Sequence, residues 1–428
     1  MLKLSRFLFA CVAVCICLTA VPACSLHSAL LSEQEQLVKR DEFIAAGGYS
    51  VAGSYEIEVV SERWLYDGNA LDTVLLAPHK QGKYPLIIYL PALGESADAG
   101  RLWREYWAKA GYAVLSVQAE DIAKAFADLT PDPAEKQQRH QGIFDVFGGE
   151  GPLDGAPEHG KNQPAQAMLD GDRRYISHGF FTAESLNRRV GQLSWVYRQC
   201  QQRAQARQGL FGKVDPTKTL LAGYDIGADT VTGWLTGSET DGVPIQPAAA
   251  VLLSPIVAAS SGDMRQRYQS IRLPLLVIGS DQDSDRYGIT TPQLRKFIWD
   301  YAASANKYLL WLKSARHGLF SGSEWAAPGR GEPGNEGWRG GPGGPPADFT
   351  SYFQGQGGRH GGPPGGGMGG PNRHAPEAMP AAYQEIGAVL SVSTAFLDSI
   401  AKSDNFAELW LRQNAQVWLK SVARLTAN

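Results

Sequence analysis

Continuous apolar runs alternate with amphipathic segments along most of the chain, and this alternation constrains the fold more than any other feature. A run without polar alternation is typical of a strand that is buried on both faces of a sheet. Such runs cover residues 84–90, 112–117, 219–222, 248–253, 273–278 and 307–312, and segments with helical apolar spacing lie between several of them. Because strands and helices alternate, we predict an α/β fold with a mostly parallel central sheet and helices on both faces.

The overall composition excludes several classes of protein. The chain has 428 residues, 43% of them hydrophobic, and its net charge is only -3, so it is not disordered throughout. Forty basic residues face 43 acidic ones, which gives no indication of a nucleic-acid partner. A mean hydropathy of -0.23 with one long apolar run excludes a protein with many membrane spans.

That apolar run lies at the N-terminus and predicts a signal peptide over residues 1–23. Lys3 and Arg6 precede an apolar stretch over 7–21, and a small residue then precedes Cys24. This ending resembles the processing site of bacterial lipoproteins, which implies that Cys24 is lipidated and becomes the first residue of the mature chain. Ordinary secretion with cleavage nearby is the alternative. We therefore expect a cell-envelope protein, held at the outer membrane by a lipid anchor and facing the periplasm.

The mature chain is expected to consist of a tether over residues 24–48 and one domain over 49–428. A Gly- and Pro-containing stretch over 119–180 interrupts the strand and helix pattern and predicts a lid-like insertion. Glycine makes up 18 of the 42 residues from 329 to 370, so we expect a flexible loop over 329–376. Cys200 would be the one cysteine left in this domain, in a helical run where a packed core thiol is expected.

A Gly-x-Asp-x-Gly turn follows the buried run 219–222 and precedes a helical run. Its residues are Gly223, Asp225 and Gly227. The turn resembles the nucleophile elbow of the α/β-hydrolase fold, in which the central side chain projects from the carboxyl end of the sheet. The usual central residue is serine, whereas here it is Asp225, and no Gly-x-Ser-x-Gly occurs in the sequence.

Acidic residues and a histidine follow the elbow in the order expected for that fold. Asp281, Asp283 and Asp285 come after the run 273–278, and His317 comes after the last buried run. The spacing favours Asp283 as the acid that orients His317, with Asp281 as the second choice and Asp285 as the third.

The order and spacing resemble those of dienelactone-hydrolase-like and platelet-activating-factor-acetylhydrolase-like enzymes. The resemblance implies an oxyanion hole built from the backbone amide of Ile226, after the elbow, and from that of Ala92 or Leu93, after the first buried strand.

A carboxylate at the elbow is similar to the nucleophile of haloalkane dehalogenases and epoxide hydrolases. Asp225 would then form an ester with the substrate, and His317, oriented by Asp283, would activate water to hydrolyse it. Ile226 stands where dehalogenases usually have tryptophan, and residues 91–94 replace the His-Gly-x-Pro of epoxide hydrolases.

We therefore expect a hydrolase that acts on a small-molecule ester or carbon electrophile. The alternative is a catalytically inactive lipoprotein that keeps the fold as a binding module. No Cys/His cluster has zinc spacing and no nucleotide-binding pattern occurs, so neither a metal nor a cofactor is expected. Nothing in the sequence indicates an oligomer.

Overall fold

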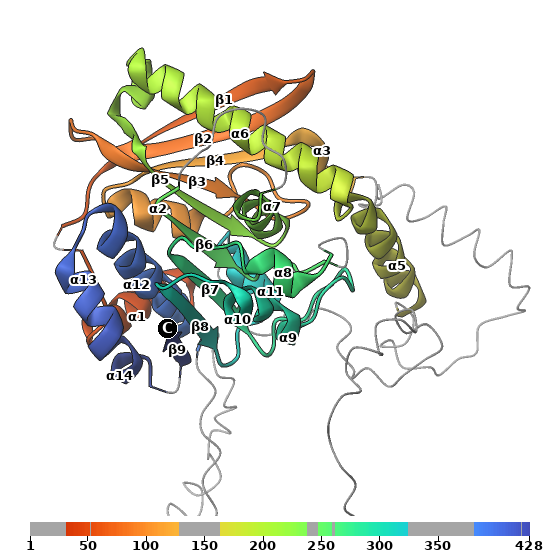
Figure 1. Cartoon of the computed structure of the whole chain (residues 1–428). Coiled ribbons are helices and arrows are strands. Elements are labelled where there is room, and N and C mark those ends of the chain that lie inside the picture. Colours follow the sequence, from red (N-terminus) through yellow and green to blue (C-terminus); the bar gives the residue numbers. More distant parts are fainter. Residues whose placement is uncertain are drawn as a thin grey trace, which may run out of the picture.

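The computed structural model describes residues 31–51, 53–127, 163–237, 247–258, 262–323, 381–420 and 422–428. The predicted signal peptide, Cys24, and the Gly-rich segment lie outside these residues, as does most of the predicted insertion, over 128–162. The described residues form one nine-stranded sheet with the order β1-β2-β4-β3-β5-β6-β7-β8-β9 (Figure 1).

The sheet is mixed and mostly parallel. Strands β3 to β8 run parallel to one another, whereas β1, β2 and β9 pair antiparallel with their neighbours. This arrangement confirms the predicted α/β class with a mostly parallel sheet. The strands are β1 (Ile57–Tyr66), β2 (Asn69–Pro78), β3 (Tyr84–Leu90), β4 (Ala113–Ala119), β5 (Val214–Tyr224), β6 (Ala249–Leu253), β7 (Leu275–Ser280), β8 (Lys307–Leu312) and β9 (Ala423–Ala427).

Helices cover both faces of the sheet, and the core is divided accordingly. Successive residues of β3 point to opposite faces. Ile87 belongs to the apolar cluster that includes α2 (Arg101–Lys109) and α12 (Ala382–Ala401). Ile88 belongs to the cluster that includes α6 (Ala183–Gln205) and α7 (Ile226–Leu235). Both faces of the central strands are therefore buried, as their continuous apolar runs predict.

The other helices are shorter or lie at the margins of the sheet. None of the helices in the described ranges is long and apolar enough to cross a membrane. They are α1 (Glu33–Ala45), α3 (Glu120–Ala123), α5 (Gln163–Phe180), a 3-10 helix (Gly209–Lys213), α8 (Met264–Tyr268), α9 (Pro292–Arg295), α10 (Phe297–Tyr301), α11 (His317–Ser321), α13 (Asn405–Leu409), a π-helical turn (Trp410–Asn414) and α14 (Ala415–Leu419).

Three segments contain elements that the sequence does not predict. Helix α1 occupies much of the expected tether, and its end packs on the C-terminal helices, where the ring of Phe43 lies 4.6 Å from that of Trp418. The expected insertion over 119–180 includes the helices α3 and α5. Residues 406–425 have the apolar spacing of a helix, but the helical turns end at Leu419, and residues 423–427 form β9 at the edge of the sheet beside β8.

Candidate functional site

The loops after β5, β7 and β8 bring Asp225, Asp283 and His317 together at the carboxyl edge of the sheet. The Nδ1 atom of His317 lies 2.8 Å from Oδ1 of Asp283. On the other side of the ring, Nε2 of His317 lies 3.7 Å from Oδ1 of Asp225. The imidazole thus stands between two carboxylates that are 0% exposed.

The backbone at Asp225 has the strained conformation of a sharp strand-to-helix turn. Its φ of 55° and ψ of -117° are costly for a residue with a side chain. A Cβ on Gly223 would lie 2.5 Å from the backbone of Gly227, and one on Gly227 would lie 2.0 Å from the carbonyl oxygen of Leu90. The two glycines allow α7 to start close against β3, and this close approach orients the Asp225 side chain toward His317.

The two oxygens of the Asp225 carboxylate have different surroundings. Oδ2 accepts a hydrogen bond from the amide of Leu93 at 3.3 Å, and the Ile226 amide also donates to this carboxylate. Oδ1 is buried, has no hydrogen-bond partner within the described ranges and faces His317. Two of the three amides that the sequence suggests for an oxyanion hole, those of Leu93 and Ile226, therefore bind the side chain of Asp225 itself.

A tight turn presents the Leu93 amide to Asp225. The amide of Glu95 donates to the Ala92 carbonyl, and Gly94 between them has a φ of 82°, which such a turn requires at its third residue. The Ala92 amide instead donates to the Glu95 carboxylate at 3.1 Å. Of the two amides predicted for this side of the hole, Leu93 is the one that contacts Asp225.

Arg295 and Ser254 complete the surroundings of Asp283, and the sequence analysis did not identify either residue. Arg295 is 0% exposed, its Nε lies 3.2 Å from Oδ2 of Asp283, and it donates to the carbonyl oxygens of Ser254 and Pro255. The Ser254 hydroxyl lies 3.0 Å from Nδ1 of His317. No motif marks these positions, since Arg295 reaches the site from the short helix α9 and Ser254 simply follows β6.

Burial and charge shift the pKa values of the two aspartates in opposite directions. Burial raises the pKa of Asp225, although the nearby His317 opposes this shift. Burial alone would also raise the pKa of Asp283, but the Arg295 guanidinium and the hydrogen bonds from His317 and Ser254 outweigh it, so that this pKa is lowered. Asp283 is thus held ionised behind the imidazole.

The other two acid candidates lie apart from the histidine. Asp281 is 60% exposed at its side chain and pairs with Lys296. Asp285 accepts hydrogen bonds from three backbone amides of its own loop, those of residues 287, 289 and 290. Among the three aspartates of this loop, Asp283 is the one within hydrogen-bond distance of His317.

Aromatic side chains surround the turn that carries Leu93. The Tyr287 hydroxyl donates to the Leu93 carbonyl at 3.3 Å, and the rings of Phe126 and Phe181 pack on Tyr287. Below the imidazole, the Tyr224 hydroxyl donates to the His317 carbonyl at 2.9 Å. These contacts from four segments fix the backbone on both sides of the Asp225 carboxylate.

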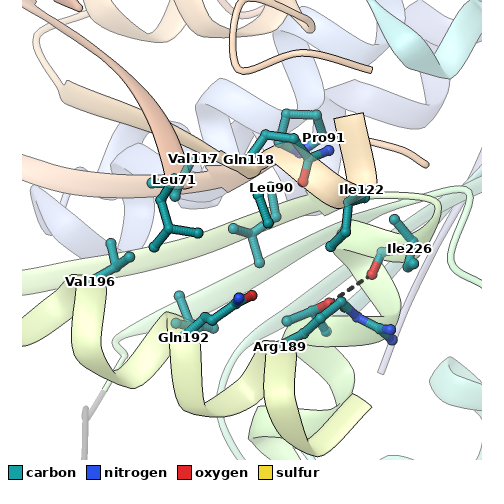
Figure 2. A pocket seen from close by; sticks show the side chains of 14 residues that line it. Leu71, Leu90, Pro91, Val117, Gln118, Ile122, Arg189, Gln192, Val196 and Ile226 are labelled. Atoms are coloured by element: carbon teal, nitrogen blue, oxygen red, sulfur yellow. Dashed lines mark hydrogen bonds between the residues drawn. The ribbon is translucent and has the colours of Figure 1, made fainter. Parts of the chain in front are cut away.

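A small cavity lies behind the elbow, between the sheet and α6. Its volume is about 40 Å³, and its lining includes Ile226 and Gly227 but neither Asp225 nor His317. Figure 2 shows Arg189 and Gln192 of α6 below the cavity and Gln118 of the sheet above it. A volume of this size holds on the order of two or three water molecules, which is too small for an organic substrate.

Comparison with known proteins leaves the chain without an assigned family. No model of a known protein family matches the sequence, and no curated protein matches it either. Within the described ranges, no group of three or more His, Cys, Asp or Glu side chains is arranged to hold a metal ion. Cys200 is buried, and burial raises the pKa of its thiol to about 12, which is typical of an unreactive core cysteine.

Proposed function

We propose that this protein is a hydrolase of the α/β-hydrolase type that acts through a covalent ester on Asp225. Three features support this proposal: the strained elbow after β5, the acid after β7 and the histidine after β8. They follow one another in the chain order of that fold. Asp225 is the proposed nucleophile, His317 the base and Asp283 the acid that orients the base.

In the first proposed step, Oδ1 of Asp225 attacks an electrophilic carbon of the substrate. A C–O bond forms between Oδ1 and that carbon, and the leaving group departs with the electrons of the bond that breaks. No hydrogen bond to Oδ1 comes from the part of the chain that the structure describes, and this leaves its lone pairs available for the attack. The preferred substrates are alkyl electrophiles such as epoxides or haloalkanes, because attack on a carboxylic ester would create a high-energy mixed anhydride.

In the second step, Nε2 of His317 takes a proton from water, and the resulting hydroxide adds to the Cγ atom of the Asp225 ester. Negative charge then develops on Oδ2, which the Leu93 amide stabilises, and the Ile226 amide donates to the same carboxyl group. Collapse of this intermediate breaks the bond between Cγ and Oδ1, and the protonated His317 returns its proton to the alcohol that leaves. This leaves Asp225 as a carboxylic acid with one oxygen from water, and loss of its proton to solvent restores the carboxylate.

The observation that carries the proposal is the direction of the two amides. In a serine-type acyl transfer, such amides bind an oxygen of the substrate. Here the Leu93 amide binds Oδ2 of Asp225, the atom that becomes the oxyanion when an aspartyl ester is hydrolysed. The arrangement therefore fits hydrolysis at Asp225 better than acyl transfer from it.

A single turnover in heavy-oxygen water tests this mechanism directly. Epoxides, haloalkanes and p-nitrophenyl esters would be screened first, with His317→Ala as the inactive control. The expected result is a gain of one heavy oxygen in the peptide that contains Asp225. With His317→Gln, we expect the same peptide to carry the substrate's alkyl group, because the second step is blocked. Turnover that leaves the peptide unlabelled would overturn covalent catalysis.

One observation favours the second candidate, a binding module without turnover. Asp225 is 0% exposed and His317 is 4% exposed, so the reacting atoms are closed to solvent in the described structure. Under this alternative the Asp225–His317 pair is a buried ion pair. Ligands would then raise the melting temperature of wild type and of His317→Ala alike, and no member of the panel would be hydrolysed.

We also propose that Cys24 anchors the mature protein to the bacterial cell envelope. The apolar run over 7–21 and the cysteine that follows it support this proposal. Mass spectrometry of the N-terminal peptide is expected to find lipid on Cys24, and Cys24→Ala should move the protein from the membrane fraction to the soluble fraction. An unmodified N-terminus at another residue would indicate ordinary secretion instead.

A further inference from the structure

Glu95 joins two elements that have to stay aligned at the site. It lies in the loop after β3, and its two carboxylate oxygens bind different partners. Oε2 accepts the Ala92 amide at 3.1 Å, next to the Leu93 amide that contacts Asp225. Oε1 accepts the hydroxyl of Ser321 at 2.5 Å, at the end of the helix that begins with His317.

The bond to Ser321 belongs to a longer chain of hydrogen bonds. Ser321 and Ser323 have their hydroxyl oxygens 2.7 Å apart, and the Gly100 amide donates to Ser323 at 3.0 Å. Because a hydroxyl has one proton, Ser321 donates to Glu95 when Ser323 donates to Ser321. Each donor in this series then points toward the Glu95 carboxylate. The hydrogen bonds thus connect both ends of the loop after β3, at Glu95 and at Gly100, to the segment after His317.

The opposite side of the same loop is held by the sheet. The Gln118 amide at the end of β4 donates to the carbonyl oxygens of Ala92 at 2.9 Å and Glu95 at 3.1 Å. The Leu93 amide is thus positioned between a contact to β4, through Gln118, and a contact to α11, through Glu95. Only the second contact also reaches the helix of His317.

We propose that Glu95 is a positioning residue, which holds the Leu93 amide and the His317 helix in register with Asp225 through its hydrogen bonds to Ala92 and Ser321. Its importance for turnover rests on the proposed function, whereas its linking of the two elements does not. A misplacement of about 1 Å at a reacting group can cost a factor of about 100 in rate.

The alternative role for Glu95 is that of a proton donor or acceptor in the reaction. Glutamine distinguishes the two roles, because it can replace Glu95 in hydrogen bonding but not in proton transfer. In Glu95→Gln, the amide oxygen can accept from Ala92 while the amide nitrogen donates to Ser321, whose hydroxyl then turns to Ser323. Glutamine therefore keeps the link but cannot exchange a proton, whereas Glu95→Met has a similar size and loses both.

Hydrogen exchange measures the link without any substrate. We expect Glu95→Met to raise the exchange rates of amides in both 91–96 and 317–323 by at least tenfold, while Glu95→Gln stays close to wild type. Ser321→Ala, which removes a single hydroxyl, should raise exchange in the same two segments by a smaller factor. Ser399→Ala is the matched control, since its hydroxyl donates to the Phe396 carbonyl of its own helix.

Kinetics on a substrate found by the panel provides the second measurement. Glu95→Met is expected to lower kcat 10- to 100-fold with KM changed less than threefold, and Glu95→Gln should keep kcat within about threefold of wild type. Glu408→Gln, on the surface of α13, is the control for charge removal.

Two outcomes would overturn the proposal. If Glu95→Met and Ser321→Ala loosen 91–96 but leave 317–323 unchanged, Glu95 does not link the two elements. If Glu95→Gln loses as much kcat as Glu95→Met, Glu95 is a proton-transfer group. A wild type without turnover would count against the proposed function, and the exchange data would still decide the link.

Discussion

At the level of single residues, the fold stabilises the ionised form of one aspartate in the site, Asp283, and destabilises the ionised form of the other, Asp225. Asp283 has a lowered pKa because Arg295 and the hydrogen bonds of His317 and Ser254 outweigh its burial. Asp225 has a raised pKa because burial outweighs the attraction of His317. Carboxylates with opposite shifts a few ångströms apart are typical of functional sites, where stability is given up for chemistry.

Replacement of Asp225 by asparagine should stabilise the protein. A carboxyl group whose pKa is raised in the folded state lowers the free energy of unfolding as it ionises, that is, as the pH rises through the raised pKa. We therefore expect Asp225→Asn to raise the free energy of unfolding by about 1 kcal/mol at neutral pH. The gain should shrink toward zero as the pH falls below the ordinary pKa of an aspartate, because Asp225 is then protonated in both the folded and the unfolded state. Urea unfolding at several pH values measures this, and an equal or lower stability of the variant at neutral pH would contradict it.

Replacement of Asp283 by asparagine should have the opposite effect. It leaves the Arg295 charge buried without its partner, which costs about 3 kcal/mol. Because the pKa of Asp283 is lowered, its contribution is present above the ordinary pKa of an aspartate and is lost only as the pH falls through the lowered value.

The exposed Asp281 provides the matched control for this variant. Its pair with Lys296 lies in solvent, so Asp281→Asn should change the free energy of unfolding by less than about 0.5 kcal/mol. Equal effects of the two substitutions in urea unfolding would show that the Arg295 pair contributes little.

At the level of elements, the turn between β5 and α7 decides whether the site forms. Gly227→Ala would place a methyl group 2.0 Å from the Leu90 carbonyl oxygen, so α7 has to move away from β3. We expect a loss of about 3 kcal/mol in the free energy of unfolding. Gly179→Ala in α5 is the control, because a Cβ there meets open space and alanine favours the helix by about 0.5 kcal/mol or more. A tolerated Gly227→Ala in thermal unfolding would contradict the tight approach.

The sequence predicts well those elements whose pattern is formed by residues close together in the chain. The apolar run of residues 307–312 coincides with β8, and Gly223 and Gly227 mark the elbow, because both patterns are imposed by neighbours in the chain. Arg295 and Ser254 could not be found in this way. Their role depends on the contact of α9 with the end of β6, which no local pattern encodes.

Strand β9 at the end of the chain is a second element that local sequence patterns do not predict. Residues 406–425 have helical apolar spacing, and the structure forms helical turns there only up to Leu419. The last strand, β9, exists because β8 offers an unpaired edge to it. Edge pairing is a property of the assembled sheet, and tertiary context of this kind overrides local propensity.

At the scale of the whole molecule, the described residues on both sides of the Gly-rich segment are fixed independently of it. The chain before the segment is held at Gly322, whose carbonyl accepts the Leu102 amide at 2.8 Å. The chain after it enters α12, which is packed in the core. Since the free energy of closing a loop depends only weakly on its length, the segment is expected to be a tolerated insertion.

Deletion of residues 329–370 tests this expectation. The melting temperature should stay within about 2 °C of wild type, and any turnover should be unchanged. Deletion of residues 423–428 is the contrasting variant, because it removes β9 and leaves β8 at the edge of the sheet. A large loss of stability on removal of 329–370 would show that the segment contributes to the fold.

The position of β9 also determines when the site can be completed during synthesis. Strand β8, which leads into His317, is flanked on one side by β7 and on the other by residues 423–427. They follow β8 by about 110 residues in the sequence, so the ribosome adds them long after β8. A nascent chain can therefore arrange Asp225 and Asp283 early, but the strand before the histidine obtains its outer neighbour only after residues 423–427 have left the ribosome.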